Sequence, residues 1–274
     1  VQAVCDRGTQ MVDLGGRTLT PGLIDAHSHL SAFGHMELFF VKIRPPQVHD
    51  FDSLRRVLAA AAQKLPRGAW IVARGFNEFD EERFPCRWDV DPATPNNPAL
   101  LIHWTGQYGV ANTLALQEAD LFSPQAQDPY GGKFLRDRQG VPDGRLLHYP
   151  AIYAVHQHRM TPEEEYRAVL WGAQRFIEQG VTCVHDNFAS QRSNIAYVTA
   201  ERQGELPLRL RLYPYVANLQ HCQQMVQRLK RYEGPLVRVQ GVKLAVDGYP
   251  LMYKVLPQHQ QINMPMHPAD QFQA

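Results

Sequence analysis

From Thr161 to Val246 the sequence alternates helix patterns with strand patterns, and this alternation constrains the fold more than any other feature of the chain. Thr161 and Glu164 have the spacing of a capping box, Pro162 suits the first helical position, and Gly180 suits the stop. Strand and helix patterns then alternate over residues 181–186, 193–203, 207–216, 219–232 and 237–246. Such an alternation predicts βα units on a parallel sheet, and therefore an α/β fold.

Two histidines stand one residue apart at the end of an earlier apolar stretch, TPGLIDAHSHL (residues 20–30). Leu23 and Ile24 predict a short buried strand. Because side chains alternate along a strand, His27 and His29 should project from one face, with Cα atoms about 6 to 7 Å apart. Two imidazoles in this arrangement can share one metal ion. The alternative is that one histidine is exposed and the other hydrogen-bonds to the backbone.

Composition limits the class of protein and its partners. The chain has 274 residues, of which 44% are hydrophobic and 20% charged, with a net charge of +1. This balance gives no electrostatic reason to expect a nucleic acid or membrane partner, and no apolar run of about 18 residues predicts a membrane span. Four cysteines lie far apart without CxxC spacing, which favours reduced thiols and a cytoplasmic location.

The middle of the chain has a different composition. A helix pattern over residues 52–65 is followed by the strand pattern GAWIVARGF over 68–76. Residues 76–150 are then rich in Pro, Asp, Asn and Gly, with short apolar pieces between them. We interpret this region as an inserted, loop-rich layer. Residues 251–274 form a polar tail that we expect to be loop or disordered.

The histidine segment resembles the first-strand signature of the amidohydrolase superfamily, in which both histidines bind a catalytic divalent metal at the C-terminal mouth of a (β/α)8 barrel. Five segments together resemble the amidohydrolase family 3 branch, which contains N-substituted formamide deformylases: GGRTLTPGLIDAHSHL, WIVARGFNE, TGQYGVANTLAL, GVTCVHD and GVKLAVDG. The resemblance implies a TIM-barrel-type fold of which about four βα units are present. Residues 1–20 would be the remnant of a small N-terminal β domain, and 21–250 a partial barrel with an insertion at about 70–160.

The resemblance also implies a metal-dependent hydrolase of C–N bonds other than peptide bonds. The substrate would be a small molecule with an amide, N-formyl or cyclic amide group, and a metal-activated water would attack it. The resemblance assigns metal binding, by one or two ions and with zinc favoured, to His27 and His29. Lys243 matches a family lysine that can carry CO2 as a carbamate and bridge two metals. The residues alone also allow a half-exposed lysine whose amine reaches water.

Two acidic residues stand at the ends of predicted strands. Asp186 matches the family's strand-end acid, and we expect it to hydrogen-bond rather than to bind metal. Asp247 lies on the same strand face as Lys243. It would either cap the turn at Gly248 or contact substrate beside the metal.

The central segment departs from the resembled family at two positions. Gln107 stands where the family usually has a histidine; it could touch substrate, but it cannot replace an imidazole as a proton shuttle. His148 stands where relatives tend to have glutamate. Asn112 keeps the family residue and suits the cap of the helix that begins TLAL.

The resemblance leaves the catalytic base unassigned. In the family, strands five and six each supply a metal-binding histidine and strand eight supplies the aspartate that activates water, and we find no counterpart after Gly248. A half barrel would expose the edges of its first and fourth strands, which a homo-oligomer would cover. The alternative function is a catalytically inactive amidohydrolase-like fragment with a binding or regulatory role.

Overall fold

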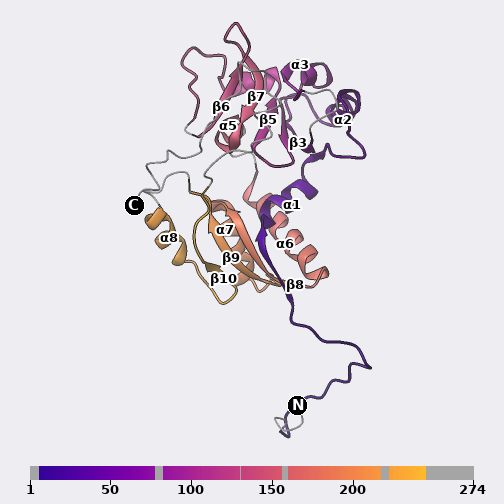
Figure 1. The fold of residues 1–274 in the computed structure, drawn as a ribbon, viewed down its shortest axis with the longest axis vertical. Helices are drawn as coiled ribbons and strands as arrows, with labels where there is room; N and C mark the ends of the chain where they lie inside the picture. Colours follow the sequence, from indigo (N-terminus) through magenta and orange to yellow (C-terminus); the bar gives the residue numbers. More distant parts are fainter. Residues whose placement is uncertain (1–5, 78–82, 130, 156–159, 217–221, 245–274) are drawn as a thin grey trace.

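The computed structural model describes residues 6–77, 83–129, 131–155, 160–216 and 222–244, and these form two sheets with their helices. One sheet has four strands and the other has six. In Figure 1 the six-stranded sheet occupies the upper part of the molecule and the four-stranded sheet the lower part, with α1 (Leu30–Leu38) between them.

The four-stranded sheet is parallel, with strand order β1-β8-β9-β10. Its strands are Leu23–Ser28, Val181–Ala189, Arg209–Pro214 and Val237–Val239. Lys243 follows β10 and makes an isolated parallel bridge with Tyr215. The predicted parallel α/β arrangement is therefore confirmed, whereas its membership of a (β/α)8 barrel stays a prediction.

Helices cover one face of the parallel sheet. They are α1, α6 (Pro162–Glu178), α7 (Gln191–Arg202) and α8 (Cys222–Lys230). The predicted capping box is present at the start of α6, where Thr161 accepts from the Glu164 backbone N–H and the Glu164 carboxylate accepts from the Thr161 backbone N–H. Buried residues of the strands and helices form one apolar cluster that includes Val184, Leu210 and Tyr197. This core fixes β8 and β9 against α7.

The first strand is less buried than its apolar sequence predicts. Leu23 is 59% exposed and Ile24 is 65% exposed, which corrects the prediction of a buried strand. The reason is its position: β1 is an edge strand with β8 as its one neighbour in the described sheet. An apolar sequence produces burial only where a second layer covers the strand.

The six-stranded sheet has the order β2-β3-β4-β5-β7-β6, parallel from β2 to β4 and antiparallel beyond. Its strands are β2 (Val41–Lys42), β3 (Ile71–Phe76), β4 (Ala99–His103), β5 (Tyr108–Ala111), β6 (Lys133–Arg136) and β7 (Pro142–Leu147). The helices that accompany it are α2 (Phe51–Lys64), α3 (Arg87–Val90), α4 (Thr113–Glu118), α5 (His148–Val155) and the 3-10 turn Asp91–Ala93.

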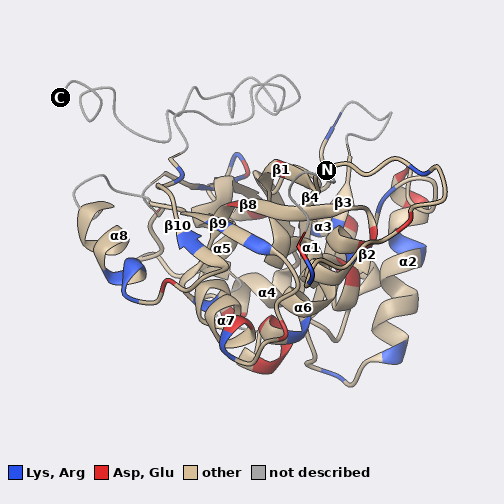
Figure 2. Cartoon of the chain, turned by 90° about the horizontal axis from the view of Figure 1, so that it is seen from below, with Lys and Arg blue, Asp and Glu red and all other residues tan. Residues whose placement is uncertain are grey.

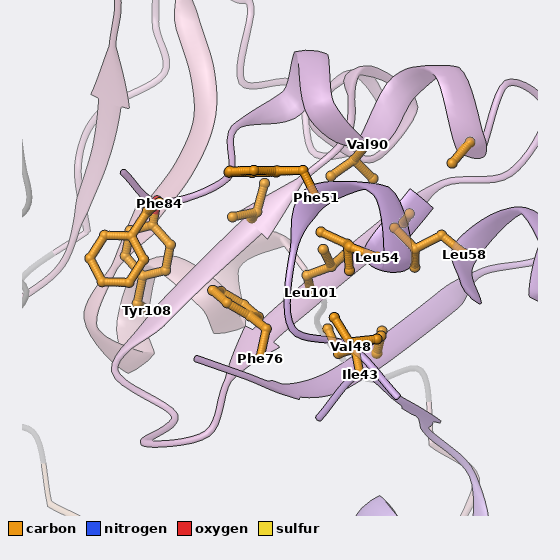
Figure 3. Close-up of a cluster of buried hydrophobic side chains, with 14 of the residues drawn as sticks. Ile43, Val48, Phe51, Leu54, Leu58, Phe76, Phe84, Val90, Leu101 and Tyr108 are labelled. Atoms are coloured by element: carbon orange, nitrogen blue, oxygen red, sulfur yellow. The ribbon is translucent and has the colours of Figure 1, made fainter. Parts of the chain in front are cut away.

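This sheet has its own core, so the region predicted to be a loop-rich layer contains buried strands between its loops. Figure 3 shows Phe51 and Leu54 of α2 facing Phe76, Leu101 and Tyr108 of the strands, all fully or almost fully buried. The strands after β3 span only four to six residues and are buried on both faces. They therefore lack polar alternation, and the intervening Pro, Asn and Gly turns dominate the composition.

The surface agrees with the balanced composition. Figure 2 shows Lys and Arg interspersed with Asp and Glu around α6 and α7. None of the helices in the described ranges has the length and apolar character needed to cross a bilayer. Three cysteines of the described part, Cys86, Cys183 and Cys222, are free thiols.

Candidate metal centre

The two histidines of the HxH segment lie at the C-terminal end of β1. His27 is in the strand and His29 is the residue that precedes α1. Their ring centroids are 5.5 Å apart and the ring planes are almost perpendicular, at 88°. Two imidazoles that bind one tetrahedral metal at about 2.1 Å would have centroids about 5.3 Å apart. The observed separation therefore fits a shared ion.

The imidazole of His29 is held in its neutral form. Its pKa is lowered to about 4, first because the ring is partly withdrawn from water and then because His27, Arg74 and Lys243 add positive charge nearby. The carboxylate of Asp25 opposes the shift. A neutral imidazole is the form that binds a metal ion.

Lys243 lies at the same C-terminal end of the parallel sheet as this pair. Its backbone N–H donates to Pro214 O at 2.8 Å and its carbonyl accepts from Val216 N at 3.0 Å, which ties it to the end of β9. Its positive charge contributes to the low pKa of His29. The structure thus brings three of the predicted metal-binding residues into one region. Asp247 lies outside the described residues.

Few side chains that can bind a metal ion lie together in the described part of the chain. Among the residues that the structure describes, no group of three or more His, Cys, Asp and Glu side chains could hold a metal ion. Metal binding by His27, His29 and Lys243 therefore stays a prediction.

An aromatic wall borders the histidine pair, and the sequence analysis missed it. The ring of Phe188, at the end of β8, is 6.0 Å from that of His29 and stacks on Tyr215 at 4.7 Å. Tyr149 of α5 meets Phe188 edge-on at 4.8 Å. Since Tyr149 belongs to the six-stranded unit, this wall joins the two sheets beside the candidate site. No periodicity in the sequence indicates these contacts.

Asp186 is buried between β8 and α7. Its carboxylate accepts hydrogen bonds from the Tyr197 hydroxyl and, at 3.2 Å, from the Phe188 backbone N–H. Burial raises the pKa of Asp186 to about 6, against the opposing effect of the Tyr197 hydrogen bond. The Tyr197 hydroxyl also accepts from the Ser31 backbone N–H at 3.1 Å. These bonds link β8 to the start of α1, immediately after His29.

Gln107 and His148 contact each other where β5 begins and the neighbouring β7 ends. The Gln107 amide oxygen lies 3.2 Å from Nδ1 of His148, and the His148 backbone N–H donates to Gln107 O at 2.7 Å. Asn112 caps α4 as predicted, because its side-chain oxygen accepts from Ala115 N.

Arg74 is a further residue that the sequence analysis did not single out. It lies in β3, and its positive charge lowers the pKa of His29, of His103 and of Tyr149. For His29 and His103 burial is the larger cause of the shift, and burial of Tyr149 raises its pKa to about 12 despite Arg74. The sequence feature that could have identified Arg74 is a single cation inside the otherwise apolar strand IVARGF.

Comparison with known proteins identifies the relatives of the chain. It is 29% identical over 256 residues to N-substituted formamide deformylase of Arthrobacter pascens, covering 88% of this chain and 46% of the relative. It is 27% identical over 256 residues to the putative amidohydrolase YtcJ of Bacillus subtilis, covering 88% of this chain and 45% of the relative. The chain therefore spans about half the length of these relatives.

A solved structure has a similar fold. An uncharacterized metal-dependent hydrolase from Pyrococcus horikoshii aligns with a TM-score of 0.56 at 19% identity, over 84% of this chain and 43% of the other. The family model described as "Amidohydrolase family" matches residues 10–274, which include the histidine pair and Lys243. The chain belongs to the amidohydrolase family.

Proposed function

We propose that this chain carries metal-binding residues of a metal-dependent hydrolase that cleaves C–N bonds other than peptide bonds in small molecules. The C–N bonds to be cleaved would belong to amide, N-formyl or cyclic amide groups. The observation that carries the proposal is the geometry of His27 and His29, whose rings lie 5.5 Å apart at the end of a parallel strand. The C-terminal ends of parallel strands are where catalytic groups collect in α/β folds.

Imidazole nitrogens and a carbamate oxygen are ligands that suit a divalent metal of intermediate softness, and zinc is the favoured choice. A divalent metal would supply Lewis acidity, which lowers the pKa of water and polarises an amide carbonyl. One residue of the chain is already in the protonation state that metal binding requires. His29 stays unprotonated at neutral pH. The Phe188 ring lies 6.0 Å from that of His29 and Tyr149 meets Phe188 edge-on, so an aromatic surface borders the pair.

Lys243 is the proposed third ligand. A free ammonium would repel a metal, whereas a carbamate on Nζ supplies an anionic oxygen. Carboxylation would also replace the positive charge that Lys243 now adds beside His29. In this role Lys243 would bridge to a second ion, which gives a site of one or two metals.

The first experiment is the metal content of tagless protein by inductively coupled plasma mass spectrometry, together with its native mass. We expect near-stoichiometric metal in the unaltered chain and its loss when both His27 and His29 become alanine. His49→Ala is the matched control, because His49 is an exposed histidine whose side chain is 64% accessible and pairs with Asp50. No metal in any of these proteins, even after loading with zinc, would refute the proposal.

Activity is then measured on the metal-loaded protein with N-substituted formamides, linear amides and cyclic amides. Hydrolysis that disappears in the double histidine variant supports the proposed chemistry. The small donor set within the described ranges favours one second candidate, a metal-binding but catalytically inactive protein. Stoichiometric metal without hydrolysis of any of these substrates would support that candidate instead.

A further inference from the structure

A cavity with cationic walls lies where the end of α1 meets β2 and β3. Its volume is about 510 Å3, and its lining includes Lys42, Arg44 and Arg74, with Glu37 and Trp104. Three cations thus face one carboxylate among these residues. An excess of positive charge in a cavity favours an anionic ligand.

Two of these cations are already balanced. Lys42 and Arg44 both pair with Glu37, the latter at 3.1 Å between Nη2 and Oε1. Their side chains are 47% and 50% exposed, so water solvates them as well. Neither residue requires a ligand to satisfy its charge.

Arg74 differs from both. Its Nε is shielded from solvent and has no hydrogen-bond partner in the described ranges, and no carboxylate of those ranges forms an ion pair with it. Arg74 is half-buried, and a cation that is partly withdrawn from water without a carboxylate partner in the described ranges is suited to a ligand that supplies the missing charge.

The surroundings of Arg74 leave room for its guanidinium. Gly106 has a φ of +74°, and a Cβ added there would lie 3.3 Å from Nη2 of Arg74. The charge of Arg74 also reaches His29 on the other sheet. Arg74 therefore lines the cavity and is also near enough to His29 to affect the charge of its imidazole.

We propose that Arg74 binds a carboxylate group of the substrate, so that the substrates are N-acylated or N-formylated carboxylic acids. The orientation of the amide toward His27 and His29 rests on the proposed function; the carboxylate site does not. A planar guanidinium matches a carboxylate through two parallel hydrogen bonds. A single cation without a carboxylate partner in the described ranges also calls for a monoanion rather than a dianion.

Binding to the full chain without added metal tests the carboxylate site. Calorimetry would compare N-acetylglycine with N-acetylglycinamide, which lacks the charge. We expect the acid to bind at least about 10-fold more tightly, and Arg74→Gln to remove this preference. Equal binding of both compounds to the unaltered chain would overturn the proposal. So would displacement of N-acetylglycine by equimolar inorganic phosphate, which would show a general anion site.

Arg44→Gln is the matched control, since Arg44 lines the same cavity but is paired with Glu37. We expect it to change the affinity for N-acetylglycine less than about twofold. Equal weakening by Arg44→Gln and Arg74→Gln would show diffuse attraction and would overturn the assignment to Arg74.

Thermal unfolding distinguishes binding from a structural role. Because Arg74 has no carboxylate partner among the described residues, Arg74→Met should raise Tm by about 2 to 4 °C while it abolishes carboxylate binding. A fall in Tm of similar size would make Arg74 a structural residue and overturn the proposal.

The double alanine variant of His27 and His29 separates this proposal from the proposed function. It should retain N-acetylglycine binding although it lacks metal, and loss of that binding would contradict a distinct carboxylate site. In metal-loaded protein, Arg74→Gln should lower kcat/KM for N-formylglycine at least about 10-fold and leave that for N-formylglycinamide unchanged. Equal losses for both substrates would contradict specific recognition of the carboxylate.

Discussion

The imidazole of His148 and the amide of Gln107 form one contact, with 3.2 Å between Nδ1 and Oε1. A backbone hydrogen bond from His148 N to Gln107 O runs beside it. These are the two positions at which the central segment departs from the resembled family. The two departures therefore belong to one interaction between the β4–β5 loop and the start of α5. Since an amide oxygen only accepts, Nδ1 of His148 carries the proton in this arrangement.

This contact gives a prediction for the pKa of His148, which burial lowers. Gln107→Glu places a carboxylate beside Nδ1 and favours the imidazolium. We expect the pKa of His148 to rise by about one unit or more, measured by NMR titration of its ring signals. Gln107→Leu serves as the control and should not raise it. An unchanged pKa in the glutamate variant would mean that the two side chains do not face each other in solution.

The packing of α1 on α6 depends on Gly34. A Cβ at this position would lie 2.0 Å from the backbone oxygen of Ala168, and the backbone cannot yield without separating the helices. Gly34→Ala should therefore lower the free energy of unfolding by about 3 kcal/mol. Urea unfolding measures this loss.

Gly172→Ala is the matched control on the facing helix. Its Cβ would lie 3.1 Å from the backbone oxygen of Leu30, a contact that a small shift relieves. We expect a change of about 1 kcal/mol or less. Similar losses in both variants would contradict the close approach of the helices at Gly34.

The buried carboxyl group of Asp186 should make the free energy of unfolding depend on pH. Its pKa is raised from 3.8 to about 6 by burial, so the folded state holds a proton that the unfolded state releases. The stabilisation is complete below about pH 4 and is lost as pH rises through 6, by about 2 to 3 kcal/mol. Asp186→Asn does not ionise, so its stability relative to the unaltered chain should increase over this interval.

Urea unfolding of both proteins between pH 4 and 8 measures the difference. Tyr197→Phe is an informative companion, because the Tyr197 hydrogen bond lowers the pKa of Asp186. Without that bond the transition should move to higher pH. A stability difference between Asp186→Asn and the unaltered chain that is constant across this range would exclude titration of Asp186.

Asn112 should be a major stabilising residue of the six-stranded unit. Its buried amide accepts from two backbone N–H groups and donates to three oxygen atoms, in contacts with Ala99, Ala115, Thr94 and Asn97. Asn112→Ala leaves these groups unpaired and should cost about 3 kcal/mol in urea unfolding. Asn112→Asp keeps the acceptor and should cost less. An alanine variant as stable as the unaltered chain would contradict this role.

Local patterns in the sequence were sufficient for the second half of the described fold. The capping box at Thr161 and the apolar stripe after it predict α6, and the strand patterns around Asp186 and Arg211 predict β8 and β9. The HxH spacing likewise predicts a histidine pair, because strand geometry fixes neighbouring side chains within a few residues.

The remainder depended on contacts between residues that are distant in the chain. Strands such as Tyr108–Ala111 are too short and too completely buried to show alternation, so only their pairing with β4 and β7 identifies the six-stranded sheet. For the same reason the exposure of Leu23 and Ile24 followed from the edge position of β1 rather than from their apolar character.

In the candidate site, too, local sequence motifs predicted some residues and long-range contacts decided the others. The sequence by itself determined the identity of the metal-binding candidates, because His27, His29 and Lys243 lie in recognisable local motifs. Only the tertiary structure placed Phe188, Tyr149 and Arg74, which has no carboxylate partner in the described part of the chain, in this part of the molecule. Whether a buried charge has a partner depends on the whole fold, since any partner can come from any part of the chain.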